Sequence, residues 1–251
     1  KQGPDSPDVG LICRVDLAVP DATVYHAMHD EFTGACLAMP HRPFIAWLLL
    51  PLVAHVAGAA AQEPSGAKWT EGKVIDLPKP STSGRLAFEA TLARRRSVRA
   101  FGKRDLSLAE ISQLLWAAQG ITDSGRGLRA APSAGATYPL EVYAVTGAGA
   151  FPYHPDPHRL EKLKEGDLRP ALAKAALGQS CVRLAPLTVV FAAQAERTTR
   201  RYGERGRMYV HMEAGHAAQN LHLQAVALGL GSVPVGAFDP AAVADILSLP
   251  D

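Results

Sequence analysis

Residues 207–228, "RMYVHMEAGHAAQNLHLQAVAL", carry the strongest structural signal in this chain of 251 residues. The stretch is long enough for several helical turns, and apolar or small residues surround most of its circumference. A surface helix keeps one polar face, so this pattern predicts a helix that is buried centrally or packs against a second subunit. The "GLG" at residues 229–231 is expected to end it.

Shorter elements surround this helix. Residues 106–120, "LSLAEISQLLWAAQG", predict a helix with Ser107 as its cap, Glu110 completing a capping box, and Gly120 as its end. The β-rich runs "LEVYAVTG" and "APLTVVFAA" predict strands from Leu140 and from Ala185. We further expect one helix in residues 86–97 and two short helices within residues 158–178, separated by Gly166. An irregular Pro/Gly segment is expected from residue 232, followed by a last short helix that begins at Asp239 and Pro240.

The N-terminal third has a different character. From Met39, two basic residues precede an apolar run of about 14 residues and a small-residue site ending at Ala61, the pattern of a secretory signal peptide. The run is short for a membrane span, so we expect export to the periplasm or outside the cell, with no stable membrane insertion after cleavage. The alternative is an uncleaved anchor or a buried helix. We expect residues 1–38 to be a non-native upstream extension or disordered, 39–61 the signal peptide, 62–85 an extended lead-in, and 86–251 the folded domain.

Composition excludes some functions. A formal net charge of +2 is too small for a dedicated nucleic-acid-binding protein. Beyond the signal peptide one cysteine is left, Cys181, and its apolar neighbours predict a core residue. His211, His216 and His222 are spaced by five and six residues, not the four of a helical metal pair, so no metal site is expected.

A cluster of arginines follows the first helix of the folded domain, in "RRRSVRAF" at residues 94–101. Guanidinium groups bind phosphate through forked, charge-assisted hydrogen bonds, and a serine hydroxyl can complete the oxygen shell. In an extended segment, Arg95, Ser97 and Arg99 lie on one side. The cluster therefore fits one small anion, while a solvated basic turn remains the alternative.

Two loops of small residues could approach a flat ligand. One is "APSAGATYPLEVYAV" at residues 131–145, just before a strand, and the other is "GLGSVPVGAF" at residues 229–238. The alternative for the first is a simple turn into the strand. Neither dinucleotide-binding nor P-loop spacing is present in the sequence.

Six stretches in this order resemble the nitroreductase-like flavoproteins, and specifically their SagB-type dehydrogenase branch: "RRSVRAF", "LLWAAQG", "APSAGATYPLEVYAV", "ALGQ", "RYGERGRMYVHMEAGHAAQNLHLQA" and "GLGSVPVGAF". The resemblance covers about residues 86–250. It implies an α+β fold, with a mixed β-sheet flanked by helices around a long central helix, in an intertwined homodimer that binds FMN at the subunit interface. It also implies an FMN-dependent oxidoreductase that acts on a small organic substrate, with NAD(P)H as a candidate electron donor.

The resemblance also implies roles for individual residues. The phosphate and ribityl chain of FMN would be held by Arg95, Arg96, Ser97 and Arg99. The loop of Pro132, Ser133, Ala134 and Gly135 would reach the flavin from the other subunit. The loop of Pro234, Val235, Gly236 and Ala237 would place backbone N–H groups near the flavin N5 and O4 edge, where donors stabilise the reduced ring.

Departures from the family pattern leave the reaction open. Ala136 and Tyr138 stand where many nitroreductases have ring-contacting Asn and Gln. Azoline-oxidising members carry a Lys-Tyr pair where this chain has Arg201 and Tyr202. Tyr202 would handle a proton, and Arg201 would polarise a leaving proton or an anionic substrate without acting as a base. The alternatives are a solvated loop at these residues and a catalytically degenerate flavin-binding module without turnover.

Overall fold

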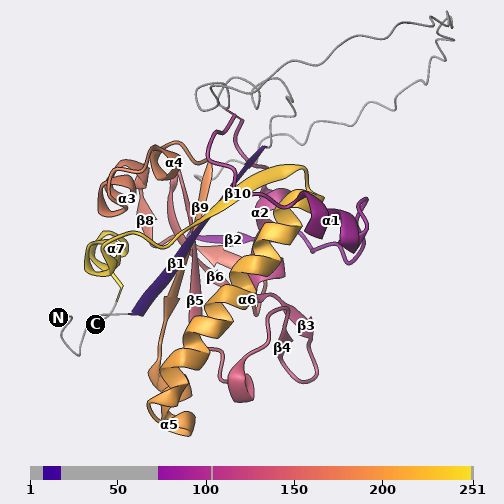
Figure 1. Cartoon of the computed structure of the whole chain (residues 1–251), viewed down its shortest axis with the longest axis vertical. Helices are drawn as coiled ribbons and strands as arrows, with labels where there is room; N and C mark the ends of the chain where they lie inside the picture. The colour runs from indigo at the N-terminus through magenta and orange to yellow at the C-terminus, as the bar shows by residue number, and fades with distance from the viewer. Residues whose placement is uncertain (1–7, 18–72, 103, 250–251) are drawn as a thin grey trace, which may run out of the picture. The chain divides into compact units, whose positions relative to one another are not determined.

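The computed structural model describes residues 8–17, 73–102 and 104–249, and of residues 8–17 it describes the backbone alone (Figure 1). An eight-stranded sheet has the order β10-β1-β9-β5-β6-β7-β2, with β8 paired to β6. Its strands are β1 (Asp8–Leu17), β2 (Val74–Asp76), β5 (Leu140–Thr146), β6 (Gly149–His154), β7 (Arg159–Glu161), β8 (Lys164–Glu165), β9 (Leu187–Ala193) and β10 (Leu230–Val235).

A small second sheet and seven α-helices complete this part of the chain. The sheet pairs β3 (Ile121–Asp123) with β4 (Leu128–Arg129), and a short 3-10 turn, η1, covers Ala134–Ala136. The helices are α1 (Phe88–Arg94), α2 (Leu108–Gln119), α3 (Arg169–Ala175), α4 (Ser180–Arg183), α5 (Glu196–Tyr202), α6 (Arg205–Ala227) and α7 (Pro240–Leu247).

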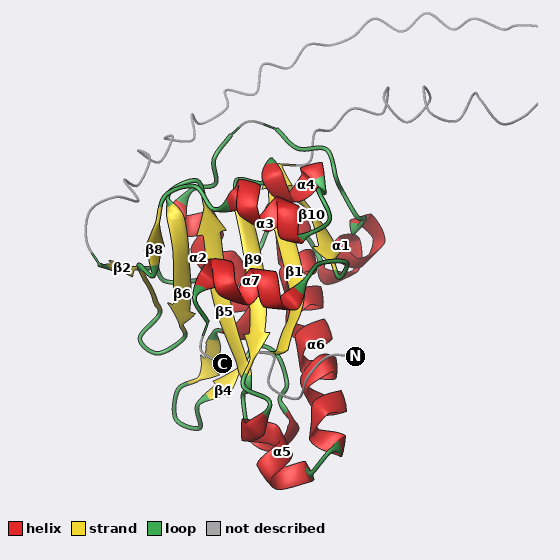
Figure 2. Ribbon diagram, turned by 90° about the vertical axis from the view of Figure 1, so that its left-hand side faces the viewer, coloured by secondary structure: helices red, strands yellow, loops and turns green. Residues whose placement is uncertain are grey.

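Helices cover both faces of the large sheet (Figure 2). Strands β5 and β9 alternate, so that Val142 and Val189 face the core under α2 and α6, whereas Val145 and Val190 face the core under α3, α4 and α7. This period of two is what a strand buried on both faces requires. The expected α+β nitroreductase-like architecture with a long central helix is confirmed.

The sheet ladders are antiparallel. Val142 pairs with Tyr153 of β6 on one side and with Phe191 of β9 on the other. In the described part of the chain, parallel pairing is confined to an isolated bridge between Ser97 and Ser232, so the sheet is mixed only at that point.

Strand β1 was not anticipated from the sequence. We expected no folded element within residues 1–38, yet Asp8–Leu17 lies between β9 and β10 and pairs antiparallel with both. The segment that was predicted as a signal peptide, residues 39–61, lies outside the described residues, so that prediction stays untested.

Local signals placed several helices correctly. Helix α2 begins after Ser107, whose hydroxyl accepts from the Glu110 N–H while the Glu110 carboxylate accepts from the Ser107 N–H, and it ends at Gly120, as predicted. Helix α7 begins at Pro240 with Asp239 as its cap.

Two predictions about local structure were wrong. Of the two helices expected within residues 158–178, only α3 forms, because residues 159–165 pair with β2 and β6 as strands β7 and β8. The segment from residue 232, expected to be irregular, begins within strand β10, because β1 supplies a partner for Pro234 and its neighbours.

The described end of the lead-in, residues 73–85, belongs to the folded domain. Strand β2 pairs with β7, and the segment after it lies along α2. The Ser112 hydroxyl donates to the Pro78 carbonyl at 2.6 Å and also contacts His158 Nε2 at 2.7 Å. Since the Ser112 hydroxyl donates its proton to Pro78, His158 Nε2 donates to the Ser112 oxygen. The histidine therefore does not accept the serine proton as a catalytic base would, and the three residues hold the segment after β2 against α2.

Candidate functional site

The arginine cluster is an extended segment that crosses from α1 to strand β10. The Arg95 N–H caps α1 by donating to Thr91, and the Val98 N–H donates to the Ser232 carbonyl at 3.0 Å. A side chain at Gly231 would lie 2.8 Å from Val98, so glycine permits this close approach of the two backbones. The backbone of residues 95–99 is therefore held against the start of β10.

The side chains of this segment carry positive charge that nothing described neutralises. Arg96 is exposed and donates to the Ala93 and Arg95 carbonyls. Within residues 73–102 and 104–249, whose side chains the structure describes, Arg95, Arg96 and Arg99 form no ion pair with a carboxylate. Several guanidinium groups beside an exposed serine hydroxyl are the donor set that a phosphate takes.

A buried histidine supports this segment from beneath. His222, near the C-terminal end of α6, has its Nδ1 atom 2.6 Å from the Ser232 hydroxyl. Burial lowers the pKa of His222 to about 4, and the nearby Arg95 guanidinium acts in the same direction. His222 is therefore neutral at physiological pH, and it joins α6 to the strand that holds the arginine segment.

The small-residue loop at residues 132–135 is tightly built. Gly135 has a φ of +60°, a left-handed conformation that favours glycine. The Ser133 hydroxyl accepts from the Tyr138 N–H at 2.9 Å, which closes the loop. Pro132 and Gly135 are exposed, so the loop presents its backbone to the surface.

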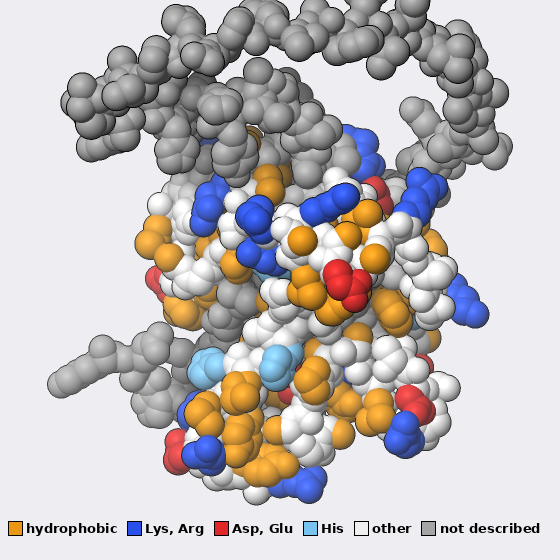
Figure 3. All heavy atoms as spheres, turned by 45° about the vertical axis from the view of Figure 1, so that its right-hand side comes forward, with side chains coloured by type: hydrophobic (Ala, Val, Ile, Leu, Met, Phe, Trp, Pro, Cys, Tyr) orange, Lys and Arg blue, Asp and Glu red, His pale blue; other side chains and the backbone are white. Residues whose placement is uncertain are grey.

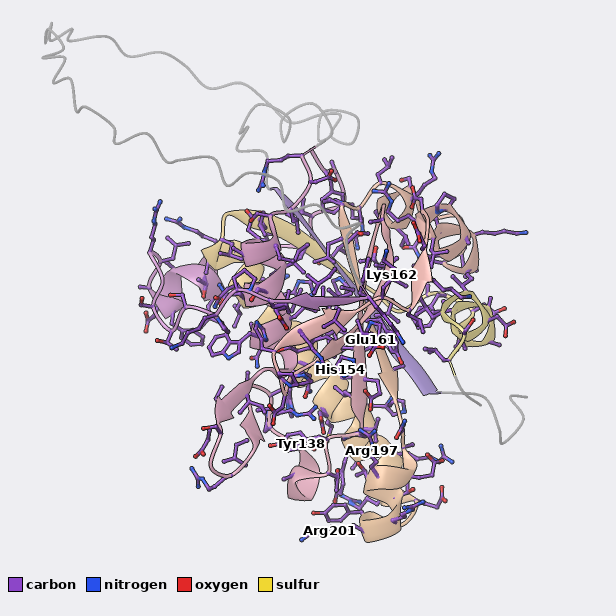
Figure 4. The ribbon with its side chains drawn as sticks, turned by 180° about the vertical axis from the view of Figure 1, so that it is seen from behind. Tyr138, His154, Glu161, Lys162, Arg197 and Arg201 are labelled. Atoms are coloured by element: carbon purple, nitrogen blue, oxygen red, sulfur yellow. The ribbon has the colours of Figure 1, made fainter. Side chains whose placement is uncertain are left out.

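Helix α5 brings Arg201 and Tyr202 to this loop. A Cβ atom at Gly135 would lie 2.7 Å from the Tyr202 hydroxyl and 2.9 Å from Arg201 Nη1. Arg201 Nη1 also donates to the Gly135 carbonyl at 3.4 Å. Arg197 anchors the same helix, because it donates to the Tyr138 carbonyl and pairs with Glu141 at 2.6 Å (Figure 4).

The loop at residues 234–237 follows the arginine segment along β10. Pro234, Gly236 and Ala237 are exposed, and Val235 is buried in the sheet. The Ala237 carbonyl accepts from Gln179 at 3.0 Å, which ties the loop to the start of α4. Residues 95–99 and 234–237 thus lie along one strand and can contact two ends of one extended ligand.

The predicted residues therefore form two groups at opposite ends of α6 (Figure 1). Arg95 lies by His222, whereas Tyr202 lies just before the helix begins at Arg205. With a rise of about 1.5 Å per residue, Arg205 and His222 are about 25 Å apart along the helix axis. Tyr202 and the arginine segment are thus well separated along the helix, while the loop at residues 132–135, which lies beside Tyr202 and Glu213, is nearer its middle.

The surface agrees with this division. Basic side chains gather on the upper part of one face, and hydrophobic side chains gather at its lower end beside two histidines (Figure 3). Met208 and Met212, on the first half of α6, are 44% and 51% exposed. Arg207 and His211 are exposed beside them, so this side of α6 is a mixture of apolar and polar side chains.

Sequence reasoning missed a buried polar cluster behind the small-residue loop. Glu213 of α6 is 3% exposed, and Gln119 of α2 is fully buried and donates to it at 3.4 Å. Arg129 donates to Gln119 at 3.0 Å and lies over the Tyr138 ring. Burial raises the pKa of the Glu213 carboxyl, while hydrogen bonds from Ser133 and Gln119 partly oppose that rise.

A groove of about 550 Å³ lies elsewhere, between the segment at residues 78–85 and the helices α2 and α6. Lys79, Arg85, Gln113 and Trp116 are among the residues that line it. It contains none of the residues predicted to bind FMN or substrate.

The chain belongs to the nitroreductase family, because the model of that family matches residues 92–251. A protein of Methanocaldococcus jannaschii named as a putative nitroreductase is 44% identical over 184 residues, which cover 71% of this chain and 92% of that protein. The protein is therefore an enzyme of the oxidoreductase class.

Solved structures agree with this assignment. A putative nitroreductase from Ralstonia eutropha is 35% identical, covers 76% of this chain and 89% of its own, and has a TM-score of 0.67. A chain of the Escherichia coli microcin synthetase McbBCD complex, solved with truncated pro-MccB17 bound, is 26% identical, with a TM-score of 0.53 and coverage of 72% and 73%.

Across residues 8–17, 73–102 and 104–249, no helix combines the length and the apolar character needed to cross a bilayer.

Proposed function

We propose that the protein is an FMN-dependent oxidoreductase of the SagB-type dehydrogenase branch, working as a homodimer with its flavin between two subunits. The observation that carries this proposal is the set of arginines at residues 95–99, which backbone contacts hold beside β10 and which have no carboxylate partner among the side chains of residues 73–102 and 104–249. Such unbalanced charge on a fixed backbone fits a phosphate group.

The residues present fit FMN. Arg95, Arg96, Ser97 and Arg99 would hold the phosphate, and the exposed N–H groups at Gly236 and Ala237 would face the ring edge of the same flavin. FMN, when bound, supplies hydride exchange at N5 with a small organic substrate. This chain contributes binding, orientation and hydrogen-bond donors at that edge.

The second subunit would complete the site. On the pattern of the resembling flavoproteins, Pro132, Ser133, Ala134 and Gly135 would serve the flavin whose phosphate the other copy binds. The exposed side of the first half of α6, where Met208 and Met212 lie beside Arg207 and His211, would then face the partner copy, which is the role that the sequence pattern of this helix allows.

The substrate would approach at the end of α5. The Tyr202 hydroxyl lies against the exposed loop at Gly135 and would pass a proton to or from the substrate. The Arg201 guanidinium stays charged. It would attract an anionic group of the substrate or stabilise the negative charge that forms on the substrate when a proton leaves. The SagB-type branch rests on the six stretches of sequence that resemble it, and NAD(P)H is the electron donor to be tried first.

We also propose export, on the basis of the pattern at residues 39–61. Cleavage after Ala61 would remove strand β1, which pairs with both β9 and β10. A molecule that has been exported and cleaved therefore lacks β1, and a molecule whose sheet contains β1 has not been cleaved after Ala61. Mass measurement of the mature protein distinguishes them.

A second candidate function is a flavin-binding module without turnover. It is favoured by Arg201, which stands where azoline-oxidising members have a lysine. In that case FMN binds, but neither NAD(P)H nor an azoline substrate changes its redox state.

The purified protein tests the proposal. It should be yellow, release FMN on denaturation and bind added FMN, and the R95A/R99A variant should lose that affinity. The R126A variant is the control, because Arg126 is exposed and pairs with Asp123 away from the arginine segment. A colourless protein that does not bind FMN would overturn the proposal.

Turnover is tested separately with Tyr202→Phe. This change removes one hydroxyl, so FMN binding should persist while the rate of flavin oxidation by substrate falls at least about tenfold. Unchanged rates in wild type and variant would argue against Tyr202, and no redox change in either would favour the binding module.

A further inference from the structure

The loop that leads into strand β5 holds residues in a conformation that their side chains disfavour. Ala136 and Tyr138 have positive φ angles, of +53° and +44°. A bulky side chain rarely adopts this left-handed conformation. A residue before a proline, as Tyr138 is before Pro139, also favours extended backbone with negative φ. Contacts from the rest of the fold therefore have to keep Tyr138 in place.

Tyr138 has such contacts at its main chain, its hydroxyl group and its ring. Its N–H donates to the Ser133 hydroxyl oxygen at 2.9 Å, and its carbonyl accepts from Arg197 Nη1 at 3.0 Å. Its hydroxyl oxygen accepts from the Arg129 N–H at 3.2 Å, and the Arg129 guanidinium carbon lies 4.4 Å from the centre of its ring. A cation at this distance over an aromatic face is attracted to the ring. The loop, α5 and β4 thus all hold this one residue.

Arg129 is itself fixed from the core. Its Nη1 donates to the side-chain carbonyl of Gln119 at 3.0 Å, and Gln119 is fully buried in α2. Gln119 in turn donates to the buried Glu213 of α6 at 3.4 Å. The cation that covers the Tyr138 ring is therefore placed by the helices of the core and not by the loop.

Tyr138 also connects the loop to α5, the helix that carries Arg201 (Figure 4). Arg197, which donates to the Tyr138 carbonyl, lies in the first turn of this helix. Beside this contact, the Thr198 and Thr137 hydroxyl oxygens lie 2.8 Å apart. A change in the position of Tyr138 would therefore move both the exposed loop and the start of α5.

We propose that Tyr138 is a positioning residue for the flavin site: its ring, held beneath the Arg129 guanidinium, keeps the loop at residues 132–135 in the conformation that contacts FMN. This inference rests on the proposed function. Backbone strain that a fold maintains is found above all at active sites and at loops that clamp a ligand. Tyr138 acts through the backbone of the loop, and Arg129 acts through Tyr138.

The change Tyr138→Asn tests the role of the ring. Asparagine tolerates a left-handed backbone, so this variant adds no strain, but it has no ring to lie beneath Arg129. We expect Y138N to bind FMN at least about tenfold more weakly than wild type, measured by titration of flavin fluorescence. Tyr138→Phe keeps the ring and should restore the affinity to within about threefold of wild type. Wild-type affinity in Y138N, or a Y138F protein as weak as Y138N, would overturn the inference.

A variant of a second tyrosine separates positioning from a general loss of stability. Tyr143 lies in β5 and packs against the core under α3, α4 and α7, on the other face of the sheet from α6. Tyr143→Asn should lower the melting temperature and leave FMN affinity as it is in wild type, at a temperature where circular dichroism shows every variant folded. Equal loss of FMN in Y143N and Y138N would overturn the inference, because loosening of β5 would then suffice.

Arg129→Met tests the same contact from its other side. It should weaken FMN binding as Y138N does, and the double variant Y138N/R129M should be little worse than either single variant, because both changes remove one contact. The matched control is Arg126→Met, which removes a charge from an exposed position of the same hairpin, where Arg126 pairs with Asp123. Fully additive losses in the double variant, or an equal loss of affinity in R126M, would overturn the inference.

The outcome for the wild type separates the two proposals. A wild-type protein that binds no FMN overturns the proposed function and the inference with it. A wild-type protein that binds FMN, together with a folded Y138N variant of equal affinity, overturns the inference alone.

Discussion

His222 links the arginine segment to α6, and its protonation state should set how the fold responds to acid. The pKa of His222 falls to about 4 in the folded protein, from about 6.5 in an unfolded chain. The unfolded chain therefore binds the proton first as the pH drops, and stability is lost between about pH 6.5 and pH 4.

We expect this one group to cost about 2–3 kcal/mol of unfolding free energy at pH 4.5 relative to pH 7.5. Denaturant unfolding at the two pH values measures it. In His222→Gln, which has no titrating group, the loss on acidification should be smaller by that amount. Equal losses in the two proteins would contradict the assignment.

Gly135 has a left-handed backbone and also leaves room for the Tyr202 and Arg201 side chains, and comparing alanine variants at Gly135 and Gly127 separates these two effects. Gly135 and Gly127 both have left-handed backbones, with φ of +60° and +66°, so alanine at either should cost about 1 kcal/mol of stability. A Cβ at Gly135 would also displace Tyr202 and Arg201, whereas nothing lies within 4 Å of a Cβ at Gly127.

We therefore expect G135A and G127A to lose similar unfolding free energy, while G135A alone binds FMN about tenfold more weakly. Denaturant unfolding and FMN titration measure the two effects. Equal FMN affinity in the two variants would show that the loop contributes nothing to the flavin site.

Single residues were predictable where the signal is local. The clustering of Arg95, Ser97 and Arg99 was visible because they are neighbours in the chain. Glu213 was missed because its partners Gln119 and Ser133 are far away in sequence, and nothing in the helical pattern of residues 207–228 distinguishes a carboxylate that faces inward.

At the scale of elements, the exposed side of α6 makes a prediction about assembly. Met208 and Met212 are half exposed on this helix. A charge at Met212 would have to be buried in a dimer, at a cost that a marginal interface does not withstand. We expect M212E to be monomeric and unable to retain FMN, whereas the wild type is a dimer.

Sedimentation measures the assembly state, and Leu184→Glu is the control. Leu184 is 60% exposed at the end of α4, on the opposite face of the sheet, so L184E should remain dimeric. A dimeric M212E protein with bound FMN would exclude this face of α6 as the interface.

Elements with their own start and stop signals were predicted well. The capping box and Gly120 bound α2 without help from the rest of the fold. Residues 158–178 were predicted to form two short helices separated by Gly166, but pairing with β2 and β6 decides the structure of residues 159–165. Strand β10 was missed for the same reason, since Gly231 and Pro234 suggest a loop until β1 supplies a partner.

At the scale of the whole molecule, the two groups of candidate residues lie at opposite ends of α6. Composition and periodicity do not predict this arrangement, since they carry no information on distances between segments. The resemblance to the nitroreductase-like proteins implied only that the loop at residues 132–135 serves the flavin of the other subunit. In one chain, about 25 Å of helix separates His222, which lies by Arg95, from Arg205, which follows Tyr202.

The central claim is that each flavin site takes its arginines from one subunit and its small-residue loop from the other. Mixing two defective subunits tests it most directly. R95A/R99A removes the phosphate contacts, and Ala134→Phe fills the loop face, so each homodimer should bind FMN at least about tenfold more weakly than wild type.

A heterodimer of the two variants, isolated with two different affinity tags, collects both defects in one site and leaves the other site intact. The account predicts one FMN per heterodimer, bound with wild-type affinity. A heterodimer that binds no more FMN than its parent homodimers would contradict a site shared between subunits.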